Sequence, residues 1–172
     1  MQILVNNAGG GQLTARYPDA TATQWSAVLD LNLRTPMLVI QLALPALSAS
    51  GGVVVNIASV AGRDHTPYHW AEYAAAKAGL IRLTTALADL AERVNVRITC
   101  VVPDWVRTER AEIELTAMTA EQRAAQPDPI PLPALTDTVI ELVRNDNLSD
   151  RVAVLRPDPN ATGAYRVIHT HA

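Results

Sequence analysis

Cysteine and strongly basic segments are nearly absent from this chain of 172 residues. The single cysteine, Cys100, cannot form an intramolecular disulfide, so the fold does not depend on oxidation. The net charge is −3 and no run of basic residues occurs, which argues against a nucleic-acid partner. Hydrophobic residues make up 49% of the chain, a composition typical of a globular protein with a buried core. The length predicts a single domain.

A long uninterrupted apolar segment is also missing. The longest apolar stretch, residues 37–47, contains Gln41 and Pro45. It is far shorter than the roughly 20 residues that a transmembrane helix needs. The first residues show no signal-peptide pattern. We therefore expect a soluble, cytoplasmic protein without a membrane partner.

Lysine is scarce as well, since Lys77 stands alone against thirteen arginines. Arginine and lysine differ most where a compact, mobile ammonium is needed, so Lys77 is a candidate functional residue. Tyr73 lies four residues earlier, and residues four apart share one face of a helix. A nearby positive charge favours the phenolate and lowers the pKa of a tyrosine from its usual value of about 10. Taken alone, such a pair is more often an ordinary solvated helix face.

Strands and helices are predicted to alternate along the chain. Short apolar and β-branched runs predict four buried strands, at residues 3–5, 53–57, 97–102 and 151–155. A capping-box pattern at residues 21–24 predicts the start of a long helix, which Pro36 and Pro45 should kink or end. Helical spacing recurs at residues 71–94 and about 135–144. A polar, Pro-rich region runs from Pro103 to Pro133, in which residues 127–133 read as a loop, and residues 157–172 read as an irregular tail. This order predicts an α/β, Rossmann-like parallel sheet with flanking helices, in one domain spanning residues 1–172.

Several polar residues stand where a parallel sheet would gather them. Asn7 and Ser59 follow predicted strands, and ligand sites of parallel sheets lie at the carboxyl ends of strands. Asn32 lies within a predicted helix, although asparagine is an indifferent helix former. Each residue also has a purely structural interpretation: Asn7 as a loop cap, Ser59 as a turn residue and Asn32 as a satisfied core amide.

Taken in order, these motifs resemble those of the short-chain dehydrogenase/reductase family. The resemblance extends from residue 1 to about residue 156 and includes Asn-Asn-Ala-Gly at 6–9, Asn32, Ser59, Tyr73-xxx-Lys77 and the segment 103–108. It implies an oxidoreductase that uses NAD or NADP and interconverts an alcohol and a carbonyl of a small-molecule substrate by hydride transfer. It also implies a homodimer or homotetramer, formed through the helices near residues 23–49 and 71–94.

The resemblance assigns roles to individual residues. Tyr73 would be the general acid/base, and Ser59 would hold the substrate oxygen. Lys77 would lower the pKa of Tyr73 and hold the nicotinamide ribose hydroxyls, and Asn32 would anchor a water molecule. Tyr73 and Lys77 would thus also contact the cofactor. The other cofactor-binding positions would be Asn7, Ala8, Gly9, Pro103, Val106 and Thr108, of which Val106 and Thr108 match contacts to the carboxamide.

The chain departs from the family pattern in three ways. It starts at what resembles the family's fourth strand, so we expect an N-terminally truncated chain lacking the Gly-rich turn that binds pyrophosphate, with its first strand exposed as a sheet edge. Gly9-Gly10-Gly11 is no substitute, because no helical pattern follows it directly. Asp104 stands where the family has glycine, and the gap from Ser59 to Tyr73 is one residue longer than usual. Two hypotheses remain open: an active oxidoreductase in a longer protein, or an inert fragment acting through subunit association.

Other candidate residues carry weaker signals. His65 and His69 are four apart, but no third ligand with suitable spacing accompanies them, so we expect no metal site. Tyr68 cannot replace Tyr73, since Glu72 rather than lysine stands four residues after it. Trp105 either lines a substrate pocket or packs over the sheet.

Overall fold

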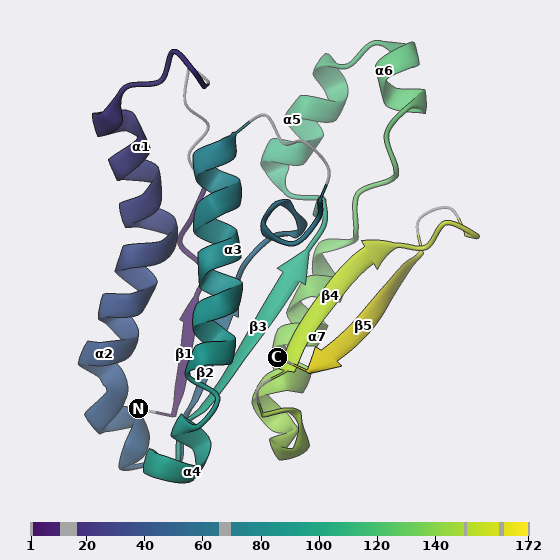
Figure 1. The fold of residues 1–172 in the computed structure, drawn as a ribbon. Helices are drawn as coiled ribbons and strands as arrows, with labels where there is room; N and C mark the ends of the chain where they lie inside the picture. Colours follow the sequence, from purple (N-terminus) through teal and green to yellow (C-terminus); the bar gives the residue numbers. More distant parts are fainter. Residues whose placement is uncertain (1, 11–16, 66–69, 150, 162–163, 172) are drawn as a thin grey trace.

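A five-stranded sheet forms the centre of the protein (Figure 1). The computed structural model describes residues 2–10, 17–65, 70–149, 151–161 and 164–171. The strands follow one another in the sheet in chain order. They are β1 (Ile3–Asn6), β2 (Val53–Ile57), β3 (Arg97–Pro103), β4 (Arg151–Pro157) and β5 (Tyr165–His171). Strands β1 to β4 pair in parallel, as predicted, and β5 pairs antiparallel to β4.

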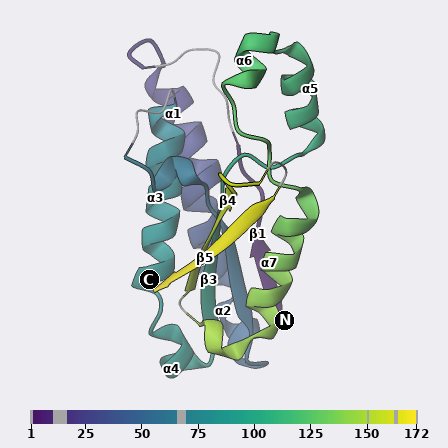
Figure 2. The same cartoon turned by 90° about the vertical axis from the view of Figure 1, so that its right-hand side faces the viewer.

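Helices cover both faces of the sheet. Helices α1 (Ala22–Leu29), α2 (Thr35–Ser48) and α3 (Ala71–Ala86) lie side by side on one face, and α7 (Leu132–Arg144) lies on the other (Figures 1 and 2). Alternate residues of the buried strands point to opposite faces. Val53 and Val55 therefore pack in the core beneath α7, whereas Val54 packs in the core beneath α2. This three-layer arrangement confirms the predicted α/β, Rossmann-like class.

The helical path from Ala22 to Ser48 is longer than the two prolines suggested. The predicted capping box closes it at the start, with Thr21 and Gln24 each bonding the other's backbone N–H. A π-helical turn, η1 (Asp30–Arg34), joins α1 to α2, and Pro36 lies in the first turn of α2. Pro45 does not end α2, so of the two expected effects, a kink or an end, the end is wrong. Its missing N–H frees the carbonyl of Gln41, and both residues are exposed, so water can satisfy that carbonyl.

By length and composition alone, the path Ala22–Ser48 would pass for a membrane span, since an 18-residue window within it has a mean hydropathy of 1.3. The sequence expectation considered only residues 37–47 and so missed this property. In the fold, Ile40 and Leu47 of this path are buried in the core against the sheet.

Three other segments differ from the expectations. The helical segment 71–94 is divided, because α3 ends at Ala86 and α4 (Leu90–Val94) begins after a turn. The Pro-rich segment contains α5 (Glu109–Ala117) and α6 (Ala120–Ala124), which are capped by Thr108 and Thr119. The expected irregular tail contains β5, because Tyr165–His171 pairs along the whole of β4.

Strand β1 lies at one edge of the sheet, as expected for the first strand. It pairs with β2 on one side only. Ile3 and Val5 are 49% and 40% exposed, so the edge presents apolar side chains. The opposite edge is β5, whose pairing covers β4.

Candidate active site

The carboxyl ends of β1, β2 and β3 open onto one cavity of about 540 Å³. The loops after these strands and the first turns of α3 form its walls. Eight of the ten predicted site residues line the cavity, while Ala8 and Asn32 do not. The eight are Asn7, Gly9, Ser59, Tyr73, Lys77, Pro103, Val106 and Thr108. Trp105 also lines it, so this side chain faces the cavity.

Tyr73 and Lys77 occupy successive turns of α3 and face the end of β2. Tyr73 is half-buried and hydrogen-bonded to the side chain of Ser59. Lys77 is only 4% exposed, and its Nζ donates a hydrogen bond of 2.8 Å to the carbonyl oxygen of Ile57. The same Nζ lies 5.6 Å from the centre of the Tyr73 ring. The helical spacing thus places an ammonium behind a phenol, with a serine hydroxyl beside the phenol.

Burial controls the acidity of both groups. It raises the pKa of Tyr73 above 10, although the Ser59 hydrogen bond and the positive charge of Arg110 lower it in part. Burial also lowers the pKa of Lys77 from 10.5 to about 8. The expectation that Lys77 would bring the pKa of Tyr73 below its usual value is therefore wrong for this structure. The reason is that loss of hydration outweighs the lowering effects of Ser59 and Arg110 on the pKa of Tyr73, and the Lys77 ammonium bonds to Ile57 rather than to the phenol oxygen.

Asn32 anchors the loop after β1 to the helices. It is fully buried within the π-helical turn, and its Nδ2 donates to the carbonyl oxygens of Gly10 (2.7 Å) and Val28 (2.9 Å). Its Oδ1 accepts from the Gly10 N–H at 2.9 Å. Both amide donors are therefore committed to the backbone. These bonds fit the satisfied core amide of the sequence analysis, while the anchoring of a water molecule by Asn32 stays a prediction.

Two glycines allow the loops to approach the site closely. A Cβ on Gly9 would lie 2.9 Å from Asn32 Oδ1 and 3.1 Å from Lys77 Nζ. A Cβ on Gly62 would lie 2.3 Å from the backbone nitrogen of Ala78, in α3. Gly62 ends the short 3₁₀ turn η2 (Val60–Gly62), which Ser59 caps through its Oγ. Sequence reasoning missed Gly62, because only the packing of η2 on α3 shows that no side chain fits there.

Asp104 is accommodated at the position where the resemblance led us to expect glycine. Among the described non-glycine residues, only Asn95 has a left-handed backbone, so Asp104 needs no glycine-like conformation. Its Oδ1 accepts from the Trp105 N–H at 2.8 Å, and its Oδ2 lies 3.6 Å from Nη1 of Arg156. Arg156 also pairs with Asp64. Sequence reasoning missed this ion-pair group, because its members are far apart in the chain.

Among the remaining candidates that the structure describes, His65 does not line the cavity. His65 is exposed, and His69 and Tyr68 fall outside the described residues. Among the described residues, no group of three or more His, Cys, Asp or Glu side chains could hold a metal ion. Ala8 is exposed beside the cavity.

Comparison with known proteins agrees with this fold. The family model of the short chain dehydrogenases matches residues 1–118, so the chain belongs to the short-chain dehydrogenase/reductase family. A hexahydro-indene-carboxyl-CoA reductase of Mycobacterium tuberculosis is 40% identical over 140 residues, covering 74% of this chain and 52% of that protein. An acetoacetyl-CoA reductase of Acinetobacter is 38% identical over 109 residues, covering 63% and 43%.

A solved structure shows the same likeness in three dimensions. A 4-hydroxyisoleucine dehydrogenase complexed with NADH superposes with a TM-score of 0.67 at 26% identity, covering 85% of this chain and 62% of that one. The chain spans about half the length of the curated relatives that it matches.

Proposed function

We propose that this chain supplies the catalytic groups of an NAD(P)-dependent oxidoreductase that interconverts an alcohol and a carbonyl, with Tyr73 as general acid/base. The observation that carries the proposal is the convergence of Tyr73, Ser59 and Lys77 on one cavity at the carboxyl end of the sheet. Ligands of open α/β sheets bind at this end. The reductases and dehydrogenases among the relatives support the same class of reaction.

The donors in the cavity fit the nicotinamide half of a dinucleotide. Lys77 Nζ carries three N–H donors, and among the described residues only the Ile57 carbonyl accepts from it. The remaining donors can bind the hydroxyls of the nicotinamide ribose. Gly9 presents no side chain toward Lys77, which leaves that space open. When bound, the nicotinamide supplies or accepts the hydride.

Tyr73 and Ser59 would manage the proton and the oxygen of the substrate. Because burial holds the pKa of Tyr73 above 10, the phenol is protonated at neutral pH and can donate its proton to a carbonyl oxygen during reduction. Ser59 lies beside the phenol and can stabilise the charge that develops on the same oxygen. In the oxidative direction Tyr73 must first lose its proton, so higher pH favours alcohol oxidation.

A second candidate function is association with another subunit without catalysis. The open β1 edge, with its exposed Ile3 and Val5, favours it, since unpaired edges bind other strands. The two functions differ in whether Tyr73 has any measurable role.

Tyr73→Phe tests the proposed catalysis. In a longer protein that joins this chain to a Gly-rich dinucleotide-binding segment of the family, we expect turnover of a carbonyl substrate such as acetoacetyl-CoA to fall about a thousandfold, since general acid–base catalysis contributes on this order. Only one oxygen is removed, so the fold should persist. NADPH and NADH oxidation, followed by absorbance, are the measurements.

Tyr165→Phe is the matched control, because Tyr165 lies on β5 away from the cavity and should leave turnover unchanged. Wild-type turnover in a folded Tyr73→Phe protein would show that another group transfers the proton.

A further inference from the structure

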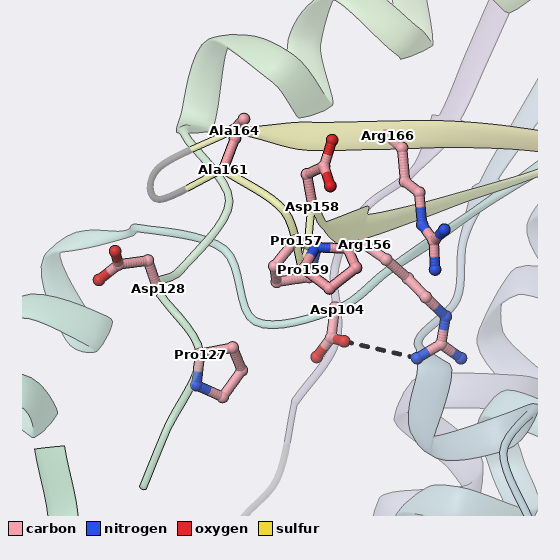
Figure 3. A pocket seen from close by; sticks show the side chains of 10 residues that line it. All are labelled: Asp104, Pro127, Asp128, Arg156, Pro157, Asp158, Pro159, Ala161, Ala164 and Arg166. Carbon is pink, nitrogen blue, oxygen red and sulfur yellow. Dashed lines mark ion pairs between the residues drawn. The ribbon is translucent and has the colours of Figure 1, made fainter. Parts of the chain in front are cut away.

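A second cavity, of about 480 Å³, adjoins the catalytic one (Figure 3). Asp104 and Pro127 line both cavities, so the two share a wall. The second cavity lies where β4 ends and β5 begins. A substrate held at Tyr73 could therefore extend toward the β4–β5 hairpin.

Two arginines face each other across this hairpin. Arg156 of β4 and Arg166 of β5 are directly opposite in the antiparallel register, and both line the cavity (Figure 3). Residues opposite each other in an antiparallel pair point to the same face, and like charges placed so are destabilising. The juxtaposition of two cations on a cavity wall is thus destabilising unless neighbouring carboxylates or a bound anion offset their charges.

The carboxylates around the cavity leave Arg166 uncompensated. Arg156 is paired with Asp64 and lies 3.6 Å from Asp104, and Asp128 is paired with Arg123. In the part of the chain that the structure describes, Arg166 has no hydrogen bond or ion pair. Asp158 accepts the N–H of Asn160 at 2.9 Å. Arg166 is exposed and, like Asp158, has no ion pair among the described residues, so its guanidinium is free to bind an anionic ligand.

The charges also indicate which anion would fit. The cavity is lined by three aspartates and two arginines, so its wall carries no excess of positive charge. A dianionic phosphate would meet stronger repulsion from the aspartates than a singly charged carboxylate would. A planar carboxylate also matches the two-pronged donor geometry of a guanidinium.

We propose that Arg166, with Arg156 beside it, binds a carboxylate of the substrate while the reacting hydroxyl or carbonyl carbon lies at Tyr73. The inference rests on the proposed function and narrows its substrate class to hydroxy and oxo carboxylic acids. Arg166 is then a specificity-determining residue of the substrate, on an element that the sequence pattern assigned to an irregular tail.

Binding to the 172-residue chain itself tests the proposal without requiring turnover. Folded protein is titrated with 6-hydroxyhexanoate, with hexane-1,6-diol, which lacks the carboxylate, and with inorganic phosphate. Nuclear magnetic resonance of the arginine side-chain N–H groups follows the titration. We expect 6-hydroxyhexanoate to bind about tenfold more tightly than the diol, the effect of one charged hydrogen-bonded contact. Phosphate should bind more weakly than the carboxylate.

Arg166→Gln should abolish the preference for the carboxylate over the diol. Arg144→Gln is the matched control, since Arg144 is exposed at the end of α7 and does not line the cavity. Equal binding of carboxylate and diol by the wild type, a preference that survives Arg166→Gln, or tighter binding of phosphate would each overturn the proposal.

Tyr73→Phe separates this inference from the proposed function. If carboxylate binding depends on Arg166 but turnover in the longer protein does not depend on Tyr73, the catalytic proposal fails alone. If turnover depends on Tyr73 and carboxylate binding does not depend on Arg166, the carboxylate site fails alone.

Discussion

Lys77 is buried with a single hydrogen-bond acceptor among the described residues, the carbonyl of Ile57. Loss of hydration lowers its pKa from 10.5 to about 8. At pH values between about 8 and 10.5, Lys77 is therefore more fully protonated in the unfolded chain, where it is hydrated, than in the folded chain. The free energy of unfolding should therefore rise with pH from about 8 to 10.5, and below pH 8 the burial of Lys77 costs stability.

Lys77→Met should remove this pH dependence. At pH 7 the free energy of unfolding of the variant should exceed that of the wild type by about 3 kcal/mol, the order of magnitude that such a pKa shift represents. The gain over the wild type should shrink as pH rises toward 10, because the wild-type lysine loses its charge. Urea unfolding of both proteins at pH 7 and pH 10 measures the difference. An equal difference at both pH values would show that the Lys77 charge carries no such cost.

At the level of single residues, the sequence identified the groups that lie close together along the chain. Tyr73 and Lys77 are four apart on a helix, so their juxtaposition follows from helical geometry. Ser59 follows a β-branched strand, so its place at the carboxyl end of the sheet was also predictable. Arg156 and Arg166 were not identified, because only the register of β4 with β5 places them opposite each other.

Among the secondary-structure elements, the contact between η2 and α3 positions Ser59 beside Tyr73. Gly62→Ala should disrupt it, since the added Cβ would lie 2.3 Å and 2.4 Å from backbone atoms of Ala78 and Lys77, which cannot move aside. We expect a loss of stability of about 1–3 kcal/mol, as for other overpacked sites. Urea unfolding at constant pH is the measurement.

Gly79→Ala provides the comparison for Gly62→Ala. The three atoms nearest its Cβ would all belong to the side chain of Leu33, the closest at 2.8 Å, and a side chain can adjust. Gly79→Ala should therefore cost less than Gly62→Ala. The reverse order would mean that η2 can move away from α3 without cost.

The elements predicted well are those with strong periodicity or β-branched runs, such as β2 and α7. The elements missed are α5, α6 and β5, because prolines and polar residues interrupt the hydrophobic periodicity of these segments. Threonine caps at Thr108 and Thr119 start the two missed helices, and these were the signals to use. Strand β5 forms because β4 provides a partner, and no local pattern contains that information.

Across the whole molecule, an apolar surface on α2 predicts assembly. Met37, Leu38 and Leu42 are 45%, 44% and 81% exposed, and α2 lies beside α1 and α3 on one side of the sheet (Figure 1). We predict a dimer or tetramer through these helices. Light scattering at micromolar concentration should give the mass of an oligomer, and Leu42→Glu should shift it toward the monomer.

Ile113→Glu controls for the added charge. Ile113 is 70% exposed on α5, away from α2, so its substitution should leave the oligomer intact. A folded wild-type chain that is already monomeric would contradict the prediction.

We also predict that residues 1–172 by themselves bind NADH and NADPH weakly. Lys77 and the loop at Thr108 can hold the nicotinamide half of the cofactor. Pyrophosphate binding needs free N–H groups at a helix N-terminus. The helix N-terminus at Thr108 borders the cavity, but it carries Glu109 and Glu112 in its first turn, and these repel anions. Calorimetric titration of the folded chain should show no saturation at micromolar cofactor. A low micromolar dissociation constant would contradict this prediction.

The sequence by itself determined the class of fold, the parallel direction of the first four strands and the meeting of Ser59, Tyr73 and Lys77 at one end of the sheet. These features depend on hydrophobic periodicity and on short spacings, which local geometry converts directly into position. The tertiary structure decided the rest. This includes the raised pKa of Tyr73, the hydrogen bonds of the Asn32 amide to the backbone, the close approach of Gly62 to α3 and the strand register that places Arg156 opposite Arg166. Each of these depends on burial or on contact between distant segments, and the free energy of such contacts exists only once the chain has packed.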